Sequence, residues 1–315
     1  MALSSMPAIR QDSSFPDKEP VWIEESQTSR GNGRKVDCQR RASRKQAEAE
    51  RYDETEEIMI HTFQRYEKKF LMEESVMRQI LPQIDKYMSK DIYCREGSYY
   101  PVSNLYYDTS GDDVIRESLQ KPYYKEKLRM RSYGIPQTAD SPVYLELKKK
   151  VDGIVTKRRA GLTYGQAQTF LQQGQVRIGE DDYLTRQVLR EIAYYLSHEA
   201  VYAASRISYE RLAYFSRKDE SFRLTFDRNL RYLKAERAGQ EVDFRDPAPG
   251  RMILPEHLYL MEVKVSDAYP LWFAHLLNTD GVIPVSFSKY GASYKTELIR
   301  GMKGNTDYLD ILSQI

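Results

Sequence analysis

The chain has 315 residues, of which 41% are hydrophobic, so it can bury one substantial core and we expect one main domain. Its 48 basic residues nearly balance 46 acidic residues, and the net charge of +2 argues against a polycation that coats nucleic acid. Cys38 and Cys94 are the only cysteines, which argues against a disulfide scaffold or a thiolate metal site and fits a reducing, cytoplasmic setting.

Residues 1 to about 60 mix Ser, Pro, Gly, Gln and charges of both signs, almost without apolar periodicity. We expect a disordered polar extension there, with a short polar helix around Arg44 to Glu57. The sequence shows neither a secretory signal nor a run of about 18 apolar residues, so we expect no transmembrane segment of its own. Residues 61–300 are predicted to form the folded domain and residues 301–315 a C-terminal tail. The composition of the extension suits an inert tail as well as a docking segment for a partner such as a membrane protein.

Segments enriched in β-branched and aromatic residues, with alternating character, predict about eight strands. The 25 tyrosines support this interpretation, because Tyr suits a strand with one apolar and one wet side. The predicted strands are Phe63 to Leu71, Asn104 to Thr109, Lys125 to Tyr133, Pro142 to Val151, Ile154 to Ala160, Val201 to Phe215, Ser221 to Tyr232 and Leu258 to Ser266. Asp152-Gly153 predicts a two-residue hairpin, because such a turn needs positive φ. Arg217 to Glu220 predicts another turn.

Helical patterns lie between and after the strands. The predicted helices are Glu73 to Tyr87, Thr163 to Gln172, Asp182 to Ser197, Tyr269 to Asn278 and Phe287 to Arg300. Strands with inserted helices, without regular strand-helix alternation, are typical of antiparallel α+β proteins. We therefore predict an α+β fold, an eight-stranded antiparallel tunnel or closed barrel with flanking helices, since closure removes exposed edges.

Alternation along the predicted strands gathers charged and polar residues on one face and apolar residues on the other. The charged-face positions are Arg65, Glu67 and Lys69; Lys127, Arg129 and Arg131; Tyr144, Glu146 and Lys148; Lys157 and Arg159; Tyr209 and Arg211; Arg223, Thr225 and Asp227; and Glu262 and Lys264. One such face can simply meet solvent, as in many antiparallel sheets. A bias toward cations on about seven strands points instead to a face that curls around a polyanion, because like charges on neighbouring strands repel.

Polyphosphate is the polyanion that suits such a wall. Arginine grips phosphate oxygens with a planar fork, and lysine adds a compact point charge. The interleaved carboxylates Glu67, Glu146 and Glu262 suggest a bridging Mg²⁺ or Mn²⁺, both of which prefer oxygen ligands. The alternative for each glutamate is an internal salt bridge to a neighbouring cation.

Seven short motifs, in this order, resemble the VTC (vacuolar transporter chaperone) polyphosphate polymerase domain of the triphosphate tunnel, or CYTH-like, superfamily. They are Arg65-Tyr-Glu67-Lys-Lys69, Leu128-Arg129-Met-Arg131, Glu146-Leu-Lys148, Tyr209-Glu-Arg211, Arg223-Leu-Thr-Phe-Asp227-Arg-Asn229-Leu230, Glu262-Val-Lys264 and Phe287-Ser288-Lys289-Tyr290. The resemblance spans about residues 62–300. It implies a tunnel enzyme that transfers the terminal phosphate of ATP to a growing polyphosphate chain with a divalent metal.

The resemblance also implies roles for individual residues. Those it implies to contact phosphates are Lys69, Arg129, Arg131, Lys148, Lys157, Arg211, Arg223 and Lys289, with hydrogen bonds from Tyr209 and Ser288 and with Glu262 holding the metal. Among them we assign catalysis to Lys69, Arg129, Arg131, Arg211 and Arg223. The face pattern adds Arg159 and Lys264 as phosphate-binding residues, and Glu67 and Glu146 as further metal ligands. Ser288 and Lys289 begin the last predicted helix, whose N-terminus favours an anion.

One position departs from the pattern of the superfamily that this chain resembles. The hydrolytic members of that superfamily carry the motif Glu-x-Glu-x-Lys in their first strand. This chain has Arg65 at the first of those positions, which moves the site toward holding phosphate chains. Two alternatives stay open, namely a tunnel hydrolase of inorganic or nucleoside triphosphate, and a non-catalytic sensor of polyphosphate or inositol polyphosphate. The four histidines fit no metal-ligand spacing, and phosphoryl transfer requires no Ser-His-Asp or Cys-His nucleophile.

Overall fold

The computed structural model describes residues 66–303, except residues 153, 180, 181, 220, 236–238 and 267. The predicted extension with its short helix, and Arg65, lie outside the described residues, as do residues 304–315. Within the described part, no helix has both the length and the apolar character needed to span a membrane.

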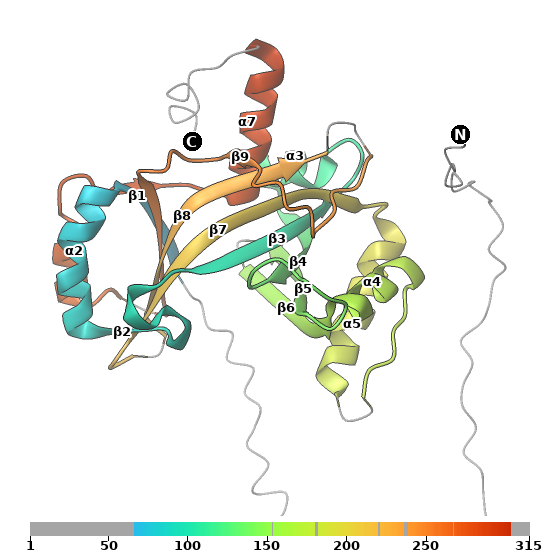
Figure 1. Ribbon diagram of the computed structural model, residues 1–315, viewed down its shortest axis with the longest axis horizontal. Coiled ribbons are helices and arrows are strands. Elements are labelled where there is room, and N and C mark those ends of the chain that lie inside the picture. Colours follow the sequence, from blue (N-terminus) through green and yellow to red (C-terminus); the bar gives the residue numbers. More distant parts are fainter. Residues whose placement is uncertain are drawn as a thin grey trace, which may run out of the picture. The chain divides into compact units, whose positions relative to one another are not determined.

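One large antiparallel sheet organises the described chain (Figure 1). Its strands follow the order β11-β1-β10-β8-β7-β3-β4-β5-β6, while β2 pairs with β7 and β9 with β8. The bounds are β1 (Tyr66–Glu73), β2 (Met88–Lys90), β3 (Tyr100–Asp108), β4 (Tyr124–Ser132), β5 (Pro142–Val151), β6 (Ile154–Thr163), β7 (Tyr202–Ser216), β8 (Arg223–Lys234), β9 (Arg251–Met252), β10 (Leu258–Val265) and β11 (Ile283–Val285). All the predicted strands are present, and the short β2, β9 and β11 are additional.

The helices flank this sheet. They are α2 (Glu74–Tyr87), α3 (Asp113–Leu119), α4 (Tyr164–Gln173), α5 (Tyr183–His198), α6 (Leu271–Leu276) and α7 (Lys289–Lys303), with a 3₁₀ turn η1 at Ile92–Gly97. The predicted helices are confirmed, and α3 is additional. At the start of α4, Thr163 and Gln166 form a reciprocal capping box, and Gly174 ends the helix in the left-handed region with φ of 74°. The α+β class is thus confirmed. The end strands β6 and β11 form no ladder with each other within the described residues, so hydrogen bonding alone does not close the sheet into the predicted barrel.

The β5–β6 hairpin fixes the register of the charged face. Asp152 adopts the positive φ of 46° that the tight turn requires, as predicted. The turn joins β5 to β6, and in the resulting ladder Glu146 of β5 lies opposite Arg159 of β6. On its other side, Glu146 lies opposite Arg129 of β4. Because side chains alternate along each strand, these three residues point to the same side of the sheet.

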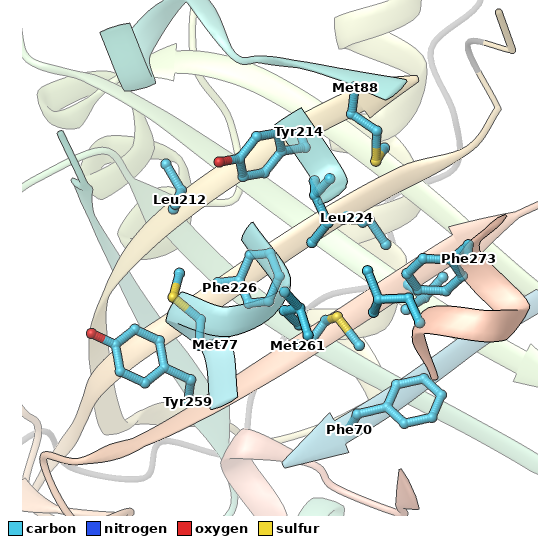
Figure 2. Close-up of a cluster of buried hydrophobic side chains, with 14 of the residues drawn as sticks. Phe70, Met77, Met88, Leu212, Tyr214, Leu224, Phe226, Tyr259, Met261 and Phe273 are labelled. Carbon is cyan, nitrogen blue, oxygen red and sulfur yellow. The ribbon is translucent and has the colours of Figure 1, made fainter. Parts of the chain in front are cut away.

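One end of the sheet buries its outer face under α2 and α6. Figure 2 shows this core, to which the strands contribute Phe70, Leu212, Tyr214, Leu224, Phe226, Tyr259 and Met261, and the helices Met77 and Phe273. Phe226 is fully buried, and cutting such a ring back to alanine costs about 3–5 kcal/mol. The charged face of these strands is thereby held on the opposite side.

The other end of the sheet buries its outer face under α4 and α5, which lie beside β5 and β6 in Figure 1. Leu128, Leu145 and Leu147 are fully buried there against Ile192 of α5. These leucines alternate with the charged residues of β4 and β5, as the sequence pattern predicts. Each end of the sheet therefore has its own outer core, and burial of the apolar side chains there directs the charged side chains to the inner face.

A third core lies on the inner face and is covered by α3 and α7. A β-bulge between β7 and β8 falls at Tyr209, where Asn229 adopts φ of 51°. The extra residue of the bulge shifts the alternation of β8, so that Asp227 and Leu230 both point to the inner face. Leu230 belongs to this third core. The inner face is therefore divided into a charged part and an apolar part.

The charged part of the inner face is concave. Lys148 of β5 lies near enough to Glu67 of β1 for the two charges to interact. In the order β1-β10-β8-β7-β3-β4-β5 these strands are six steps apart, which would be about 29 Å in a flat sheet with strands about 4.8 Å apart. The sheet therefore curls until β5 faces β1 and β10, and we call the enclosed charged surface the concave face.

Candidate functional site

The first group on the concave face is the Glu146 cluster, formed by β4, β5 and β6. The Glu146 carboxylate accepts hydrogen bonds from Arg129 Nε at 2.5 Å and Arg159 Nε at 2.7 Å. Lys157 Nζ lies 2.7 Å and Arg131 Nε 3.9 Å from the same carboxylate. The cluster thus gathers four cations around one carboxylate, and its excess charge is positive.

The electrostatics of this cluster follow from its burial. The side chain of Glu146 is only 1% exposed, and burial alone would raise the pKa of this carboxyl. The charges of Arg129, Arg131 and Lys157 outweigh burial and hold the pKa of Glu146 well below its ordinary value. Burial lowers the pKa of Lys157 to about 8, because Glu146 only partly compensates the loss of solvation. Glu146 is therefore ionised at neutral pH and serves as the internal counter-ion of the cluster.

The second group, the Glu262 cluster, is built by β7, β8, β10 and the first residue of α7. Arg211 grips Asp227 with two hydrogen bonds of 2.7 and 2.8 Å and lies 3.6 Å from Glu262. Lys289 Nζ lies 2.7 Å from Asp227 and 2.6 Å from Glu262. Burial would raise the pKa of Glu262, but Lys289 and Arg211 hold it well below the ordinary value. Two cations balance two carboxylates here, so this cluster is neutral.

Tyr209 joins the two clusters. Arg131 Nη2 of the first cluster donates to the Tyr209 hydroxyl at 3.4 Å. The Arg211 guanidinium and the Lys289 ammonium of the second cluster lie 5.1 and 4.8 Å from the centre of its ring. Burial would raise the pKa of Tyr209, but these three cations lower it below its ordinary value. One aromatic side chain thus contacts cations from β4, β7 and α7.

The last predicted residues of the concave face lie on β1, β8 and β10. Glu67 is paired with Lys69 at 2.8 Å and with Lys264 at 3.9 Å. Arg223 lies opposite Lys264 in the β8–β10 ladder, and its guanidinium stacks 4.9 Å from the ring centre of Phe215. These cations extend the positive surface from the clusters toward the end of β10.

Ser288 differs from the other predicted site residues. It is exposed, and its Oγ accepts a hydrogen bond from the backbone N–H of Gly291 at 3.2 Å. This is the geometry of a helix N-cap, which satisfies one of the unpaired N–H groups of α7. Ser288 thus supports the position of Lys289, and its hydroxyl proton is still able to donate a hydrogen bond to a phosphate.

The start of α7 is anchored by groups that were not among the predicted site residues. Tyr290 donates its hydroxyl proton to the fully buried Asp108 at 2.6 Å, and its ring stacks on Tyr106 with 4.6 Å between ring centres. The Tyr106 hydroxyl in turn accepts a hydrogen bond from Arg129 at 3.2 Å. The start of α7 therefore contacts the Glu262 cluster directly through Lys289, and it is linked to the Glu146 cluster through Tyr106, which contacts both Tyr290 and Arg129.

Three further residues of the concave face were not assigned a role from the sequence. Asp227 and Lys127 were placed on the charged face by alternation, but nothing local in the sequence indicates that Asp227 pairs with α7. Asn104, whose side-chain oxygen accepts a hydrogen bond from Arg131 at 2.8 Å, lies in a strand that reads as mainly apolar. Only the pairing of β3 with β4 reveals this contact.

A divalent metal ion fits some of these carboxylates better than others. Within the described residues, no three side chains among His, Cys, Asp and Glu converge on one point. Glu67 and Glu262 lie on adjacent strands. Burial would raise the pKa of Glu67, but the charge of Lys69 lowers it below its ordinary value, and the nearby charge of Glu262 opposes this lowering. Mg²⁺ and Mn²⁺ often take one or two protein carboxylates and complete their shells with water and phosphate, so this pair fits such an ion. Glu146 fits it poorly, because four cations already occupy its surroundings.

A comparison with known protein families covers most of the described chain. The sequence profile of the VTC domain matches residues 64–298. A search of curated proteins finds no match. Among solved structures, the chain is similar to a Bacillus halodurans protein assigned as an adenylate cyclase, at 14% identity and a TM-score of 0.36, over 78% of this chain and 94% of that one.

A second solved structure is that of a Hippeastrum protein assigned as an adenylyl cyclase and described as having a dominant triphosphatase activity. The two chains are 15% identical with a TM-score of 0.38, over 73% of this chain and 95% of that one. Structural similarity at this level carries no inference about activity.

Proposed function

The chain belongs to the VTC domain family, and from this premise we propose that it is a metal-dependent polyphosphate polymerase. In the proposed reaction, a terminal phosphate oxygen of the acceptor chain attacks the γ-phosphorus of ATP. The bond from that phosphorus to the β,γ-bridging oxygen breaks, and ADP leaves. We also propose that the curled sheet encloses the phosphates as a tunnel.

The observation that carries the proposal is the convergence of cations on the concave face. Arg129, Arg131 and Lys157 surround a single carboxylate, and Arg211 and Lys289 lie on the far side of Tyr209. Phosphoryl transfer depends mainly on positioning and on stabilising the charge of the phosphate oxygens, and arginine forks and lysine ammoniums do both.

The two clusters support different tasks in this proposal. The Glu146 cluster has excess positive charge, so it attracts a polyanion, and Lys157 can leave the carboxylate to bind a phosphate oxygen. The Glu262 cluster is neutral, and the fully buried Asp227 carboxylate pairs with both Arg211 and Lys289, so these cations are held in place. Rigid donors stabilise developing charge without the reorganisation that a flexible side chain would need.

The divalent metal belongs to this proposal as well. Glu67 and Glu262 would hold it, and the bound ion would neutralise phosphate charge. The cations of the concave face would orient ATP and the acceptor, because their guanidinium and ammonium groups bind phosphate oxygens.

One assay distinguishes a polymerase from a hydrolase. It uses purified protein, Mn²⁺ and ATP labelled at the γ-phosphate. The proposal predicts labelled phosphate polymers that form a ladder on a gel, and no polymer from ATP labelled at the α-phosphate. Labelled orthophosphate as the only product would favour the hydrolase. Binding without turnover would favour the sensor. Arg211→Ala should abolish the ladder, whereas Lys149→Met, on the outer face of β5, should leave it intact.

A further inference from the structure

Four tyrosines of the described chain form a row of rings beside the Glu146 cluster. The ring centres of Tyr93 and Tyr100 are 6.2 Å apart, and those of Tyr100 and Tyr133 are 5.9 Å apart. The ring of Tyr144 follows, with its centre 6.0 Å from that of Tyr133. Each neighbouring pair meets edge to face, so the positive edge of one ring lies against the negative face of the next. We call these four residues the tyrosine row.

The tyrosine row lies one step along the strands from the Glu146 cluster. Tyr144 of β5 lies two residues before Glu146, and Tyr133, which directly follows β4, lies two residues after Arg131. Residues on one face of a strand succeed one another at about 7 Å. A ligand that fills the cluster therefore needs to extend by about one such step to reach the row.

Cations of both clusters lie beside the row. The Arg159 guanidinium lies 4.6 Å from the ring centre of Tyr144. Burial would lower the pKa of Arg159, but Glu146 and a hydrogen bond with the Tyr133 hydroxyl contribute to raising it above its ordinary value. Tyr100 lies opposite Arg211 of the Glu262 cluster in the β3–β7 ladder. The row is thus fixed to the same arginines that surround the concave face.

Two rings of the row are open to solvent, because Tyr93 is 71% and Tyr133 52% exposed. The stacked pair of Tyr106 and Tyr290 is different, since both of these rings are buried in the third core. Burial of apolar surface drives folding, so exposed rings contribute little to the stability of a core. Exposed aromatic rings that adjoin one another next to clustered cations indicate a ligand site.

We propose that the tyrosine row binds the nucleobase of ATP, which stacks on the exposed ring of Tyr133. The choice of this ligand rests on the proposed function, in which the neighbouring cations hold the triphosphate. Every nucleobase has a π-face, so an aromatic ring stacks on it without hydrogen bonds to its edge. Tyr133 is the ring for this contact because it is exposed and is also tied to Arg159. Inorganic tripolyphosphate has no base, so it makes no use of the row.

Binding measurements without turnover test this site. The probes are inorganic tripolyphosphate and the ATP analogue in which NH replaces the β,γ-bridging oxygen, so that its γ-phosphate is not transferred. Calorimetry with Mg²⁺ would give both affinities for the wild type, Tyr133→Leu and Tyr133→Phe. We expect Tyr133→Leu to bind the analogue roughly tenfold more weakly, because one stacking contact is lost. Its affinity for tripolyphosphate should change by less than about twofold, since this probe does not stack.

Two further variants separate the ring from other effects of the substitution. Tyr133→Phe keeps the ring and loses the hydroxyl that bonds Arg159, so it should keep the wild-type ratio of the two affinities. Tyr183→Leu removes a ring that is 62% exposed at the start of α5, on the outer side of the sheet. This matched control should bind both probes as the wild type does.

The proton NMR signals of the adenine ring provide a second readout with the same analogue and Mg²⁺, which is diamagnetic. An aromatic ring stacked on a base moves the signals of that base to higher field. The wild type and Tyr133→Phe should both produce this shift. Tyr133→Leu should lose most of it at a concentration that saturates the variant.

The outcomes for the nucleobase site and for the proposed function are distinct. The site is refuted if Tyr133→Leu binds the analogue as tightly as the wild type, or if it loses affinity equally for both probes. It is also refuted if the adenine signals shift equally in the wild type and in Tyr133→Leu. If no labelled polymer forms from ATP but the analogue-specific loss is present, the nucleobase site stands and the polymerase proposal fails.

Discussion

The Lys289 ammonium lies 2.6 Å from the Glu262 carboxylate, and this contact ties the first residue of α7 to the middle of β10. The same ammonium lies 2.7 Å from Asp227 of β8. A helix at the end of the domain therefore contributes directly to the charged surface that three central strands build.

Replacement of Lys289 by methionine should affect stability and turnover together. Asp227 and Glu262 would share Arg211 as their remaining close cation, and breaking a buried ion pair commonly costs about 3–5 kcal/mol. We expect a loss of about 3 kcal/mol in the free energy of unfolding by urea, and at least a hundredfold loss of polymer formation per folded molecule. Arg300→Met, at an exposed position of the same helix, is the control and should change neither quantity. An unchanged turnover in Lys289→Met would remove α7 from the site.

Replacement of Glu146 by glutamine should make the chain more dependent on its ligand. Without this carboxylate, Arg129, Arg159 and Lys157 lose their shared counter-ion, so the ligand-free melting temperature should fall. Added tripolyphosphate should then raise the melting temperature of the variant by several degrees more than that of the wild type, because phosphate replaces the missing charge. Equal ligand-induced shifts in the two proteins would show that the cluster does not bind phosphate.

The Tyr209→Phe variant distinguishes the contribution of the hydroxyl from that of the aromatic ring. The ring keeps its contacts with Arg211 and Lys289, while the hydrogen bond from Arg131 is lost. We expect roughly a tenfold fall in turnover with a stability change within about 1 kcal/mol, the usual contribution of one hydrogen bond. The measurement is steady-state polymer formation together with urea denaturation. Wild-type turnover in a stably folded variant would exclude the hydroxyl from the reaction.

Anion binding should weaken as pH rises above 8. Burial lowers the pKa of Lys157 to about 8, so this side chain loses its charge there in the folded chain, whereas an unfolded lysine stays charged up to about pH 10.5. Between these values the unfolded chain binds more protons, so this group makes the ligand-free chain more stable as pH rises. Tripolyphosphate affinity should fall over the same interval, because a cation of the site is lost.

The control for this pH dependence is Lys157→Met, which has no charge to lose at this position. Calorimetry at pH 7, 8 and 9 on both proteins cancels the ionisation of the ligand, since the ligand is the same in each pair. The wild type should lose more affinity than the variant between pH 7 and 9. Parallel curves would show that Lys157 does not contact the phosphates.

The sequence predicted the charged face well where local rules determine it. The alternation along β4, β5 and β6 depends only on strand period and on the tight turn at Asp152, so Arg129, Glu146 and Arg159 were placed on one face. The apolar partners of this face pack against amphipathic helices whose period is also visible in the sequence. These features follow from short-range geometry and need no knowledge of the tertiary fold.

Contacts between distant strands could not be predicted in the same way. Asp227 holds Lys289 across 62 residues, and Tyr106 meets Tyr290 only because α7 packs over β3. The seven-residue α3 is too short to show a clear helical period. The helix-cap role of Ser288, whose Oγ accepts from the backbone N–H of Gly291, depends on where α7 begins, and its predicted contact with phosphate stays a prediction. Closure of the sheet likewise depends on its two ends, β6 and β11, which no local pattern relates.

A crystal structure of the chain with tripolyphosphate and Mn²⁺ tests the central claim most directly. The account predicts phosphates on the concave face, within hydrogen-bond distance of Arg129, Arg131 and Arg211, and an anomalous manganese peak beside Glu67 or Glu262. Phosphates bound only on the outer surface of the sheet, with the Glu146 and Glu262 ion pairs unchanged, would contradict it.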